Sequence, residues 1–278
     1  MGNGTRLCVL CATRKQTDFS LAERMNLECD ALFANQASCF AEQRAGHEGK
    51  RLRMLTTETR GIGVNRNVAL MAADSELLLF SDDDVQYYKG YAEAVCKAFD
   101  EQPKADVIVF GLDITNHGAV SKQRREKKRR LHRYNGLGAG ACRIAVRASS
   151  IAKKRIAFSP LFGGSATYSH GEDSLFLLDC YRSGLRVYGN PFVLGQCAQD
   201  VSSWFRGHHE KYFYDKGALI AAGFPRTKSL MKWVFLYKFR KTSQLPKRVI
   251  LRRMKEGMRG YRQAAPLYET PKMRVLPR

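Results

Sequence analysis

The sequence predicts an α/β fold with a mostly parallel central sheet and a basic helical appendage at the C-terminal end. Short apolar runs alternate with helical patterns over about the first 110 residues, as expected for strands joined by crossover helices. The run ELLLF has four consecutive apolar residues, which is typical of a strand buried on both faces. The segment from residue 228 onward instead interleaves Lys and Arg with apolar residues.

Each predicted element has its own local signal. Five apolar runs predict strands: LCVLCA at 7–12, DALFA at 30–34, ELLLFS at 76–81, DVIVFGL at 106–112 and LRVYGNP at 185–191. Four segments predict helices: residues 21–29, 60–75, 87–99 and 174–184. In the second helix we expect Val68, Met71 and Ala72 to share the buried face, and Gly184 follows the fourth helix as a C-cap.

Composition narrows the class of protein. With 278 residues, of which 44% are hydrophobic, the chain can bury one good-sized core. The net charge of +21 predicts polyanionic partners such as nucleic acid, anionic lipid or phosphorylated ligands. The eight cysteines are scattered and are interpreted as reduced core residues; Cys8 and Cys11 form a lone CxxC, weak support for zinc or redox chemistry.

No membrane span or export signal is expected. Residues 1–6 are too short and polar to precede a signal-peptide core, and no apolar stretch approaches the roughly 18 residues that a spanning helix needs. The sequence therefore predicts a cytoplasmic protein.

Three aspartates follow the ELLLFS strand. Asp82, Asp83 and Asp84 would repel one another unless a cation lay nearby. One interpretation is a solvated turn in which Asp84 caps the next helix. The other is a Mg²⁺ or Mn²⁺ site, since ligands of open parallel sheets bind beyond the carboxyl ends of the strands. An EF-hand is excluded because its glycine and glutamate spacing is absent.

Phosphate-facing groups lie upstream in RGIGVNRN. Gly61 and Gly63 permit close approach of the backbone, and Arg60 and Arg66 can clamp phosphate oxygens. The segment completes neither a dinucleotide fingerprint nor a P-loop. Only together with the aspartates does it form a specific constellation.

The order RGIGVNRN, ELLLFSDDDV and, about 90 residues later, GEDSLF resembles the family 2 glycosyltransferases. MNLECDALFANQAS and SSWFRGHHEKYF are similar to the branch that builds bacterial capsules and cell-surface polysaccharides. The resemblance covers roughly residues 5–220. It implies a GT-A fold, a Rossmann-type domain that binds a nucleotide-sugar donor and uses a DxD motif and Mn²⁺ or Mg²⁺.

The resemblance also implies roles for residues on the donor side. Asp84 and Asp82 match the ends of the DxD motif, with Asp84 on the metal and Asp82 nearer the ribose or sugar, whereas Asp83 fills the variable middle place. Arg66 and Asn67 match the RN that opens the helix before the metal strand. This chain has ANQAS where most members have DDGS, so Asn35 and Gln36, with Asp30 nearby, are expected to read the base, with uridine favoured.

On the acceptor side, Glu172 and Asp173 match the ED that carries the catalytic base of the family. A helix N-terminus would favour their ionised form, although ordinary capping is the alternative. Trp204 resembles an aromatic near the acceptor pocket, and His208 or His209 could reach the metal. The spacing of Gln199 and Trp204 does not make the QxxRW of processive synthases, so one sugar is transferred per encounter.

The expected organisation is a catalytic domain over residues 1–225 and a basic amphipathic helical extension over 226–278. The extension could lie on an anionic membrane at its cytoplasmic face, which suits a lipid-diphosphate-linked acceptor, or pack on the catalytic domain. The basic run at 121–133 could add to the same surface.

The expected reaction is inverting transfer of a sugar from a UDP-sugar to a glycan or lipid-linked hydroxyl. A nucleotidyltransferase with paired Asp and Mg²⁺ is the enzymatic alternative, although its Gly-rich, Lys-bearing N-terminal loop is missing. A basic nucleic-acid-binding protein is the other, although no RNP, KH or zinc signature occurs. No nucleic-acid partner is therefore expected.

Overall fold

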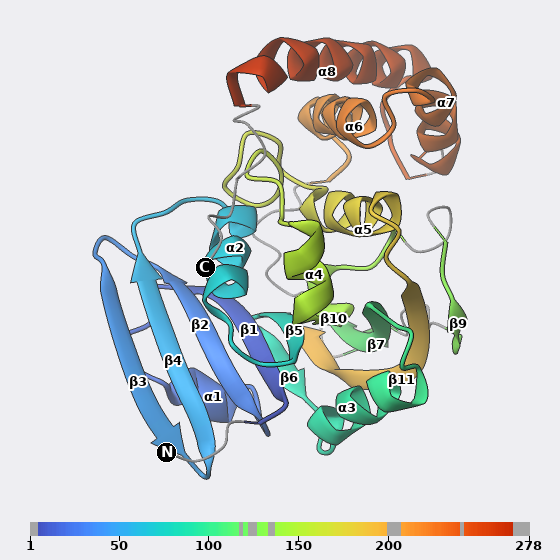
Figure 1. The fold of residues 1–278 in the computed structure, drawn as a ribbon. Helices are drawn as coiled ribbons and strands as arrows, with labels where there is room; N and C mark the ends of the chain where they lie inside the picture. Colours follow the sequence, from blue (N-terminus) through green and yellow to red (C-terminus); the bar gives the residue numbers. More distant parts are fainter. Residues whose placement is uncertain are drawn as a thin grey trace.

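The structure is a computed structural model that describes residues 5–116, 119–121, 127–132, 137–198, 207–239 and 242–268. Within them the strands form one sheet of eleven, whose main path runs β3-β4-β2-β1-β5-β10-β7-β11-β6. The predicted α/β class is confirmed, with a helical region at the C-terminal end (Figure 1).

The first half of the sheet is parallel. β1 (Leu7–Arg14) lies between β2 (Asp30–Gln36) and β5 (Leu77–Asp82), and β4 (Lys50–Thr57) extends the parallel set. β10 (Ile144–Arg147) then runs antiparallel to both β5 and β7 (Val107–Asn116). The carboxyl ends of β1, β2 and β5 therefore meet at one edge.

The central strands are buried on both faces, as the apolar runs predicted. In β5, Leu77 and Leu79 face the core on one side of the sheet, and Leu78 and Phe80 face the core on the other. α1 (Ser20–Arg24) and α3 (Tyr91–Glu101) cover the first side. α2 (Ile62–Ala72), α4 (Ala148–Lys154) and α5 (Glu172–Arg182) cover the second.

The sheet has strands that the sequence pattern did not predict. β3 (Ala41–His47) and β4 form an antiparallel hairpin at one edge. β3 is exposed along most of its length, so it lacks the apolar pattern on which the strand predictions rested. On the far side, β11 (Val187–Ala198) confirms the strand predicted at 185–191 and extends it; it pairs parallel with β7 and antiparallel with β6 (Val85–Tyr87) and β9 (Arg129–Arg130), which were not predicted. β8 (Ala119–Ser121) pairs with β7, and a short 3₁₀ turn, η1 (Ala141–Arg143), precedes β10.

The predicted buried face of helix α2 is only partly correct, because Val68 and Ala72 pack against the core and Met71 does not. Met71 of α2 is 58% exposed, and Val68 and Ala72 are only half-buried. The buried side chains include the polar Asn65, Arg66 and Asn67. The apolar pattern could not predict that these polar side chains are buried, because their partners lie in other parts of the fold.

The cysteine prediction holds for most positions. All eight are free thiols, and five are buried, but Cys39 is exposed. Gly184 follows α5 with a φ of +79°, a conformation that glycine adopts without strain, as its predicted C-cap role requires.

The C-terminal helices are α6 (Glu210–Gly223), α7 (Lys228–Phe239) and α8 (Lys247–Tyr268), grouped beside α5 (Figure 1). They share one apolar cluster, with Phe213 and Ile220 of α6 packed against Leu236 of α7 and Met254 of α8. A second cluster joins α6 to the catalytic side through Leu219, Leu175 and Phe162. No helix of the described residues is long and apolar enough to cross a bilayer.

Candidate active site

A pocket of about 710 Å³ opens at the carboxyl ends of β1, β2 and β5. Thr13, Gln36 and Asp82 reach it from these strand ends, and Arg66 and Asp173 reach it from the N-terminal halves of α2 and α5. In an open α/β sheet this edge is where ligands bind. The two motifs predicted to carry chemistry therefore meet in one pocket.

Arg66 lies at the centre of a carboxylate cluster. Its Nη2 donates to Asp82 at 2.8 Å, and its Nη1 donates to Asp173 at 2.9 Å and to Glu172 at 3.1 Å. The side chain is only 3% exposed and also lies over the ring of Phe158. Arg66 was predicted to clamp phosphate; in the structure it joins the acidic triplet to the ED pair, which lies about 90 positions further along the chain.

The three aspartates have different surroundings. Asp82 pairs with Arg66, and Asp83 accepts a 2.5 Å hydrogen bond from the Thr13 hydroxyl. Desolvation of its carboxyl group and the negative charge of Asp82 raise the pKa of Asp84, an effect that the Cys197 thiol opposes. No side-chain cation among the described residues forms an ion pair with Asp84.

These aspartates suit a divalent cation that arrives with phosphate. The described residues hold no cluster of three or more His, Cys, Asp or Glu side chains that would cage a metal by itself. Mg²⁺ in phosphate-binding sites commonly uses one or two carboxylates and fills its other positions with water and substrate oxygens. Asp84, with negative charge that Arg66 does not offset, fits that demand.

Asp173 has the environment of a general base. Burial and the negative charge of Glu172 raise its pKa to about 7, against the lowering effect of Arg66. A base with a pKa near the working pH combines availability with basicity better than an ordinary carboxylate. It lies in the first turn of α5, after Gly171 with a φ of +112°.

The loop before α5 contains a residue that the sequence analysis missed. His170 lines the pocket and stacks on Tyr212, with ring centroids 4.7 Å apart. Burial and the positive charges of Lys216 and Lys211 lower the pKa of His170 to about 3, so the ring is neutral near pH 7. Its position directly before the GED segment could have identified His170 as a candidate site residue from the sequence.

Hydrogen bonds define the His170 tautomer. The Ser169 hydroxyl donates to Asp215 at 2.6 Å, so its oxygen must accept from Nδ1–H of His170, which lies 3.2 Å away. The Nε2 atom then carries a lone pair, and it has no hydrogen-bond partner among the described residues. Asp215, fully buried on α6, also accepts from the Ser169 backbone N–H and from Lys211.

Several predicted donor residues have structural roles instead. Asn67 is buried away from the pocket and exchanges two hydrogen bonds with the backbone of Phe158. A Cβ atom on Gly63 would lie 2.5 Å from the Ser159 carbonyl oxygen, so this glycine permits helix packing and not phosphate approach. Arg60 is exposed and does not line the pocket.

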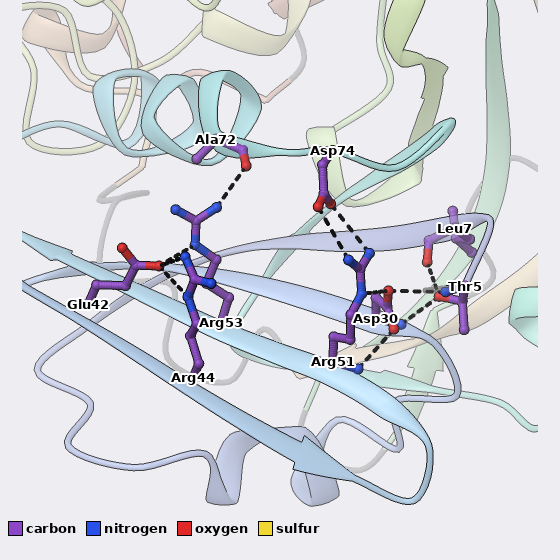
Figure 2. Close-up of polar contacts among 9 residues, drawn as sticks. All are labelled: Thr5, Leu7, Asp30, Glu42, Arg44, Arg51, Arg53, Ala72 and Asp74. Atoms are coloured by element: carbon purple, nitrogen blue, oxygen red, sulfur yellow. Dashed lines mark hydrogen bonds and ion pairs between the residues drawn. The ribbon is translucent and has the colours of Figure 1, made fainter. Parts of the chain in front are cut away.

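Asp30 lies at the opposite end of β2 and cannot contact a donor in this pocket. Figure 2 shows its carboxylate accepting from the Arg51 side chain and the Thr5 backbone, while Arg51 also pairs with Asp74. It anchors the start of β4 because its other oxygen accepts from the Arg51 backbone N–H. The prediction failed because Asp30 begins the strand whose far end reaches the pocket.

Of the predicted base-reading pair, Gln36 lines the pocket and Asn35 does not. Asn35 is buried, and its amide bonds the backbone of Gln16 on the neighbouring loop. Gln36 donates to the Gly61 carbonyl at the start of α2, where a φ of +93° requires glycine. Asn65, which was not predicted, lines the pocket and bonds the carbonyls of Thr13 and Ala34.

The two histidines predicted on the acceptor side, His208 and His209, do not line the pocket. His208 bonds the Thr242 carbonyl and packs against Tyr212 and Phe239 among the C-terminal helices. His209 caps α6 by accepting from the Tyr212 backbone N–H. Trp204, Gln199 and positions 122–126 and 133 of the basic run lie outside the described residues.

The fold and the site define the class of protein: an enzyme with a GT-A fold whose acidic motif and candidate base share one pocket. Residues 34–156, somewhat less than half of the chain, match the family model described as Glycosyl transferase family 2. This match and the shared fold agree with the sequence-based identification and with the predicted enzyme class.

The chain is similar in fold to solved structures of S. aureus TarS. It aligns with TarS 1-349 in complex with UDP-GlcNAc at 15% identity and a TM-score of 0.61, covering 94% of this chain and 92% of that one. With TarS 1-349 in complex with UDP the identity is 15% and the TM-score 0.57, and the alignment covers 95% of this chain and 91% of that one. With a longer TarS chain the identity is 16% and the TM-score 0.60, and the alignment covers 95% of this chain and 55% of that one. Among curated proteins no match was found.

Proposed function

We propose that this glycosyltransferase moves one sugar from a nucleoside-diphosphate sugar to an acceptor hydroxyl with inversion at the anomeric carbon. The observation that carries the proposal is the Arg66 cluster, which holds Asp82 on the leaving-group side and Asp173 on the nucleophile side of one pocket. A single displacement needs these two functions on opposite sides of the reacting carbon.

In the proposed reaction Asp173 takes the proton of the acceptor hydroxyl, whose oxygen forms a bond to the anomeric carbon. The bond from that carbon to the phosphate oxygen breaks, and the nucleoside diphosphate leaves. Arg66 keeps Asp173 and Asp82 at a fixed separation, and Thr13 fixes Asp83 beside them. Such pre-organisation supplies rate because the reacting groups need not be ordered during the step.

A divalent cation, Mn²⁺ or Mg²⁺, belongs to this proposal. Asp84 and Asp82 would hold it, and when bound it would offset the charge that develops on the departing diphosphate. The uncompensated charge around Asp84 supports this assignment.

A UDP-sugar is the first donor to test, and the neighbours described as holding UDP-GlcNAc and UDP motivate that order. The proposed acceptor is a hydroxyl of a glycan or lipid-diphosphate-linked intermediate in surface polysaccharide synthesis, handled at the cytoplasmic side. The family assignment favours this reaction over nucleotidyl transfer.

The test is a screen of UDP- and GDP-sugars with Mn²⁺, read as released nucleoside diphosphate, with Asp173→Asn as the paired variant. We expect turnover with one nucleotide class, loss on chelation, and loss in Asp173→Asn without loss of donor binding. Near-normal turnover of Asp173→Asn would remove it from the mechanism, and release of pyrophosphate from nucleoside triphosphates would favour the nucleotidyltransferase alternative.

A further inference from the structure

Helix α7 has two apolar faces, and the described part of the chain covers only one of them. Phe235, Leu236 and Phe239 pack inward against α6 and α8. A second set points outward: Leu230, Trp233, Val234 and Tyr237, which are 63%, 55%, 48% and 66% exposed. The sequence grouped all the apolar residues of this helix together, and packing divides them.

The outward set forms a continuous row. The positions follow i, i+3, i+4 and i+7, so the four side chains line one face of the helix. Eight large hydrophobic side chains are exposed among the described residues, and half of them belong to this one helix. An exposed apolar patch concentrated in this way marks an interaction surface.

The row is surrounded by positive charge. Between positions 216 and 255 the sequence has twelve Lys or Arg residues and no Asp or Glu. Arg226 and Lys238 are exposed near the two ends of α7, and Lys247 and Arg248 are exposed at the start of α8. Lys232 is half-buried, with its ammonium 5.2 Å from the centre of the Trp233 ring.

We propose that the outer face of α7 docks on an anionic lipid bilayer, with the helix axis in the plane of the interface. Trp and Tyr are favoured at that depth because one end of each side chain is apolar and the other is polar. Lys and Arg beside them contact anionic headgroups, and their long stems allow them to reach. The helix lies on the membrane without crossing it, in agreement with the absence of a spanning helix among the described residues.

Charge argues against a second copy of this chain as the occupant. A symmetric dimer through this face would bring the α7 lysines of both protomers together, with no acidic side chain on the helix to neutralise them. Each chain also carries a net charge of +21. An anionic lipid surface complements both the row and its surroundings.

Docking through α7 would also fix the position of the active site relative to the membrane. α6 carries Asp215, which bonds the loop of Ser169 and His170 at the pocket, and α6 packs against α7 through Phe213 and Ile220. The membrane face and the catalytic loop are thus held by one helix. Lipid binding requires no substrate, so its test stands apart from that of the proposed reaction.

The experiment is co-sedimentation of the full chain with phosphatidylcholine vesicles and with vesicles that also contain phosphatidylglycerol. We expect binding to the anionic vesicles only, weakened by high salt. Trp233→Ala/Tyr237→Ala should weaken it on the order of tenfold or more, because the variant loses two interfacial anchors. Arg226→Gln/Lys238→Gln should weaken it through charge alone.

The matched control is Phe40→Ala/Met71→Ala, which removes exposed hydrophobic side chains from other parts of the surface. It should bind vesicles as the unchanged chain does, and thermal unfolding should be the same for all variants. Equal binding by Trp233→Ala/Tyr237→Ala, or equal binding to neutral vesicles, would overturn the proposal. So would a lipid-independent dimer that this variant abolishes.

Tryptophan fluorescence gives an independent readout. The chain has two tryptophans, so Trp204→Phe leaves Trp233 as the single reporter. Its emission should shift to shorter wavelength with anionic vesicles and should be quenched by brominated lipid. An unchanged spectrum under conditions of full co-sedimentation would place the contact elsewhere and contradict the α7 assignment.

Discussion

At the residue scale, the mutual repulsion of the three adjacent aspartates is offset by side chains of the protein and does not depend on a metal alone. Arg66 neutralises Asp82 and also holds the ED pair, and Thr13 bonds Asp83. Only Asp84 is left with excess negative charge. The three adjacent aspartates therefore differ in chemistry because their neighbours differ.

The neighbouring carboxylate provides a test of which acid is the base. Glu172 raises the pKa of Asp173, so Glu172→Gln should lower it. Because the base must be deprotonated, activity of the unchanged enzyme should rise with pH and level off above about 7. In Glu172→Gln this rise should move to lower pH, measured as kcat against pH.

If Glu172 were the base instead, Glu172→Gln would lose activity at every pH. The matched control is Glu76→Gln, an acid on the protein surface that pairs with Arg6 and Arg147. It should leave the profile in place.

Arg66 is predicted to link stability with activity. Arg66→Met leaves three carboxylates without their cation, and breaking such a buried cluster costs about 3–5 kcal/mol. It also removes the charge that lowers the Asp173 pKa, so residual activity should need higher pH. Denaturant unfolding and the pH profile measure the two effects.

Arg66→Lys keeps the charge but cannot reach three carboxylates with one planar group. It should recover part of the stability and little of the activity. Unchanged stability in Arg66→Met would contradict the description of this cluster as buried and mutually dependent.

At the scale of elements, the loop before α5 is held from α6. Asp215 accepts hydrogen bonds from Lys211 and from both the backbone and side chain of Ser169. This contact orients His170, and Gly171 then starts the helix that carries Asp173. The C-terminal helices thus contact the candidate active site through the hydrogen bonds of Asp215.

Asp215→Asn should lower kcat more than donor affinity. The amide cannot accept from all three donors, so the loop and His170 lose their fixed orientation, whereas the aspartates after β5 keep theirs. Kinetics and nucleotide binding by calorimetry separate the two quantities. Asp179→Asn is the control, since Asp179 pairs with Arg182 on the α5 surface; an equal loss in both variants would refute a positioning role for Asp215.

The packing of α6 on α8 depends on a close approach of the two backbones. A Cβ atom on Gly217 would collide with the Met254 carbonyl. Gly217→Ala should therefore lower the free energy of unfolding by about 1–3 kcal/mol, the usual cost of overpacking. Gly46→Ala, where nothing lies within 4 Å of the added carbon, should be nearly neutral in the same denaturant titration.

At the scale of the whole molecule, the C-terminal helices are part of the folded core. Leu236, Ile250 and Met254 are buried against Phe213 and Ile220 of α6. A chain ending at residue 227 would expose this cluster. This shortened chain is therefore unsuitable for testing whether the extension binds a membrane.

We expect that shortened chain to unfold at lower denaturant concentration or to aggregate. The loss is about 1.5–3 kcal/mol for each of the three buried side chains removed. Trp233→Ala/Tyr237→Ala, which touches only the exposed face, should unfold like the intact protein. Equal stability of the shortened and intact chains would show that residues 228–278 are an independent appendage.

The sequence by itself determined the elements whose signal is local. Apolar runs buried on both faces predicted β1, β2, β5 and β7, and the glycines after and before helices marked their ends. The acidic triplet was recognised because three adjacent carboxylates are unusual at the end of an apolar run, and the ED pair was recognised through the family resemblance. The resemblance to family 2 glycosyltransferases, and hence the expected enzyme class, followed from their order along the chain.

Only the tertiary structure decided which of these residues meet. Asp30 and Gln36 belong to one strand, yet its two ends lie at opposite edges of the sheet, and only Gln36 reaches the pocket. Arg66 and Asn67 are adjacent, yet one holds the carboxylates proposed to be catalytic and the other holds the Phe158 backbone. Side-chain direction and long-range contact are properties of packing, so local pattern could name the chemical groups but not their partners.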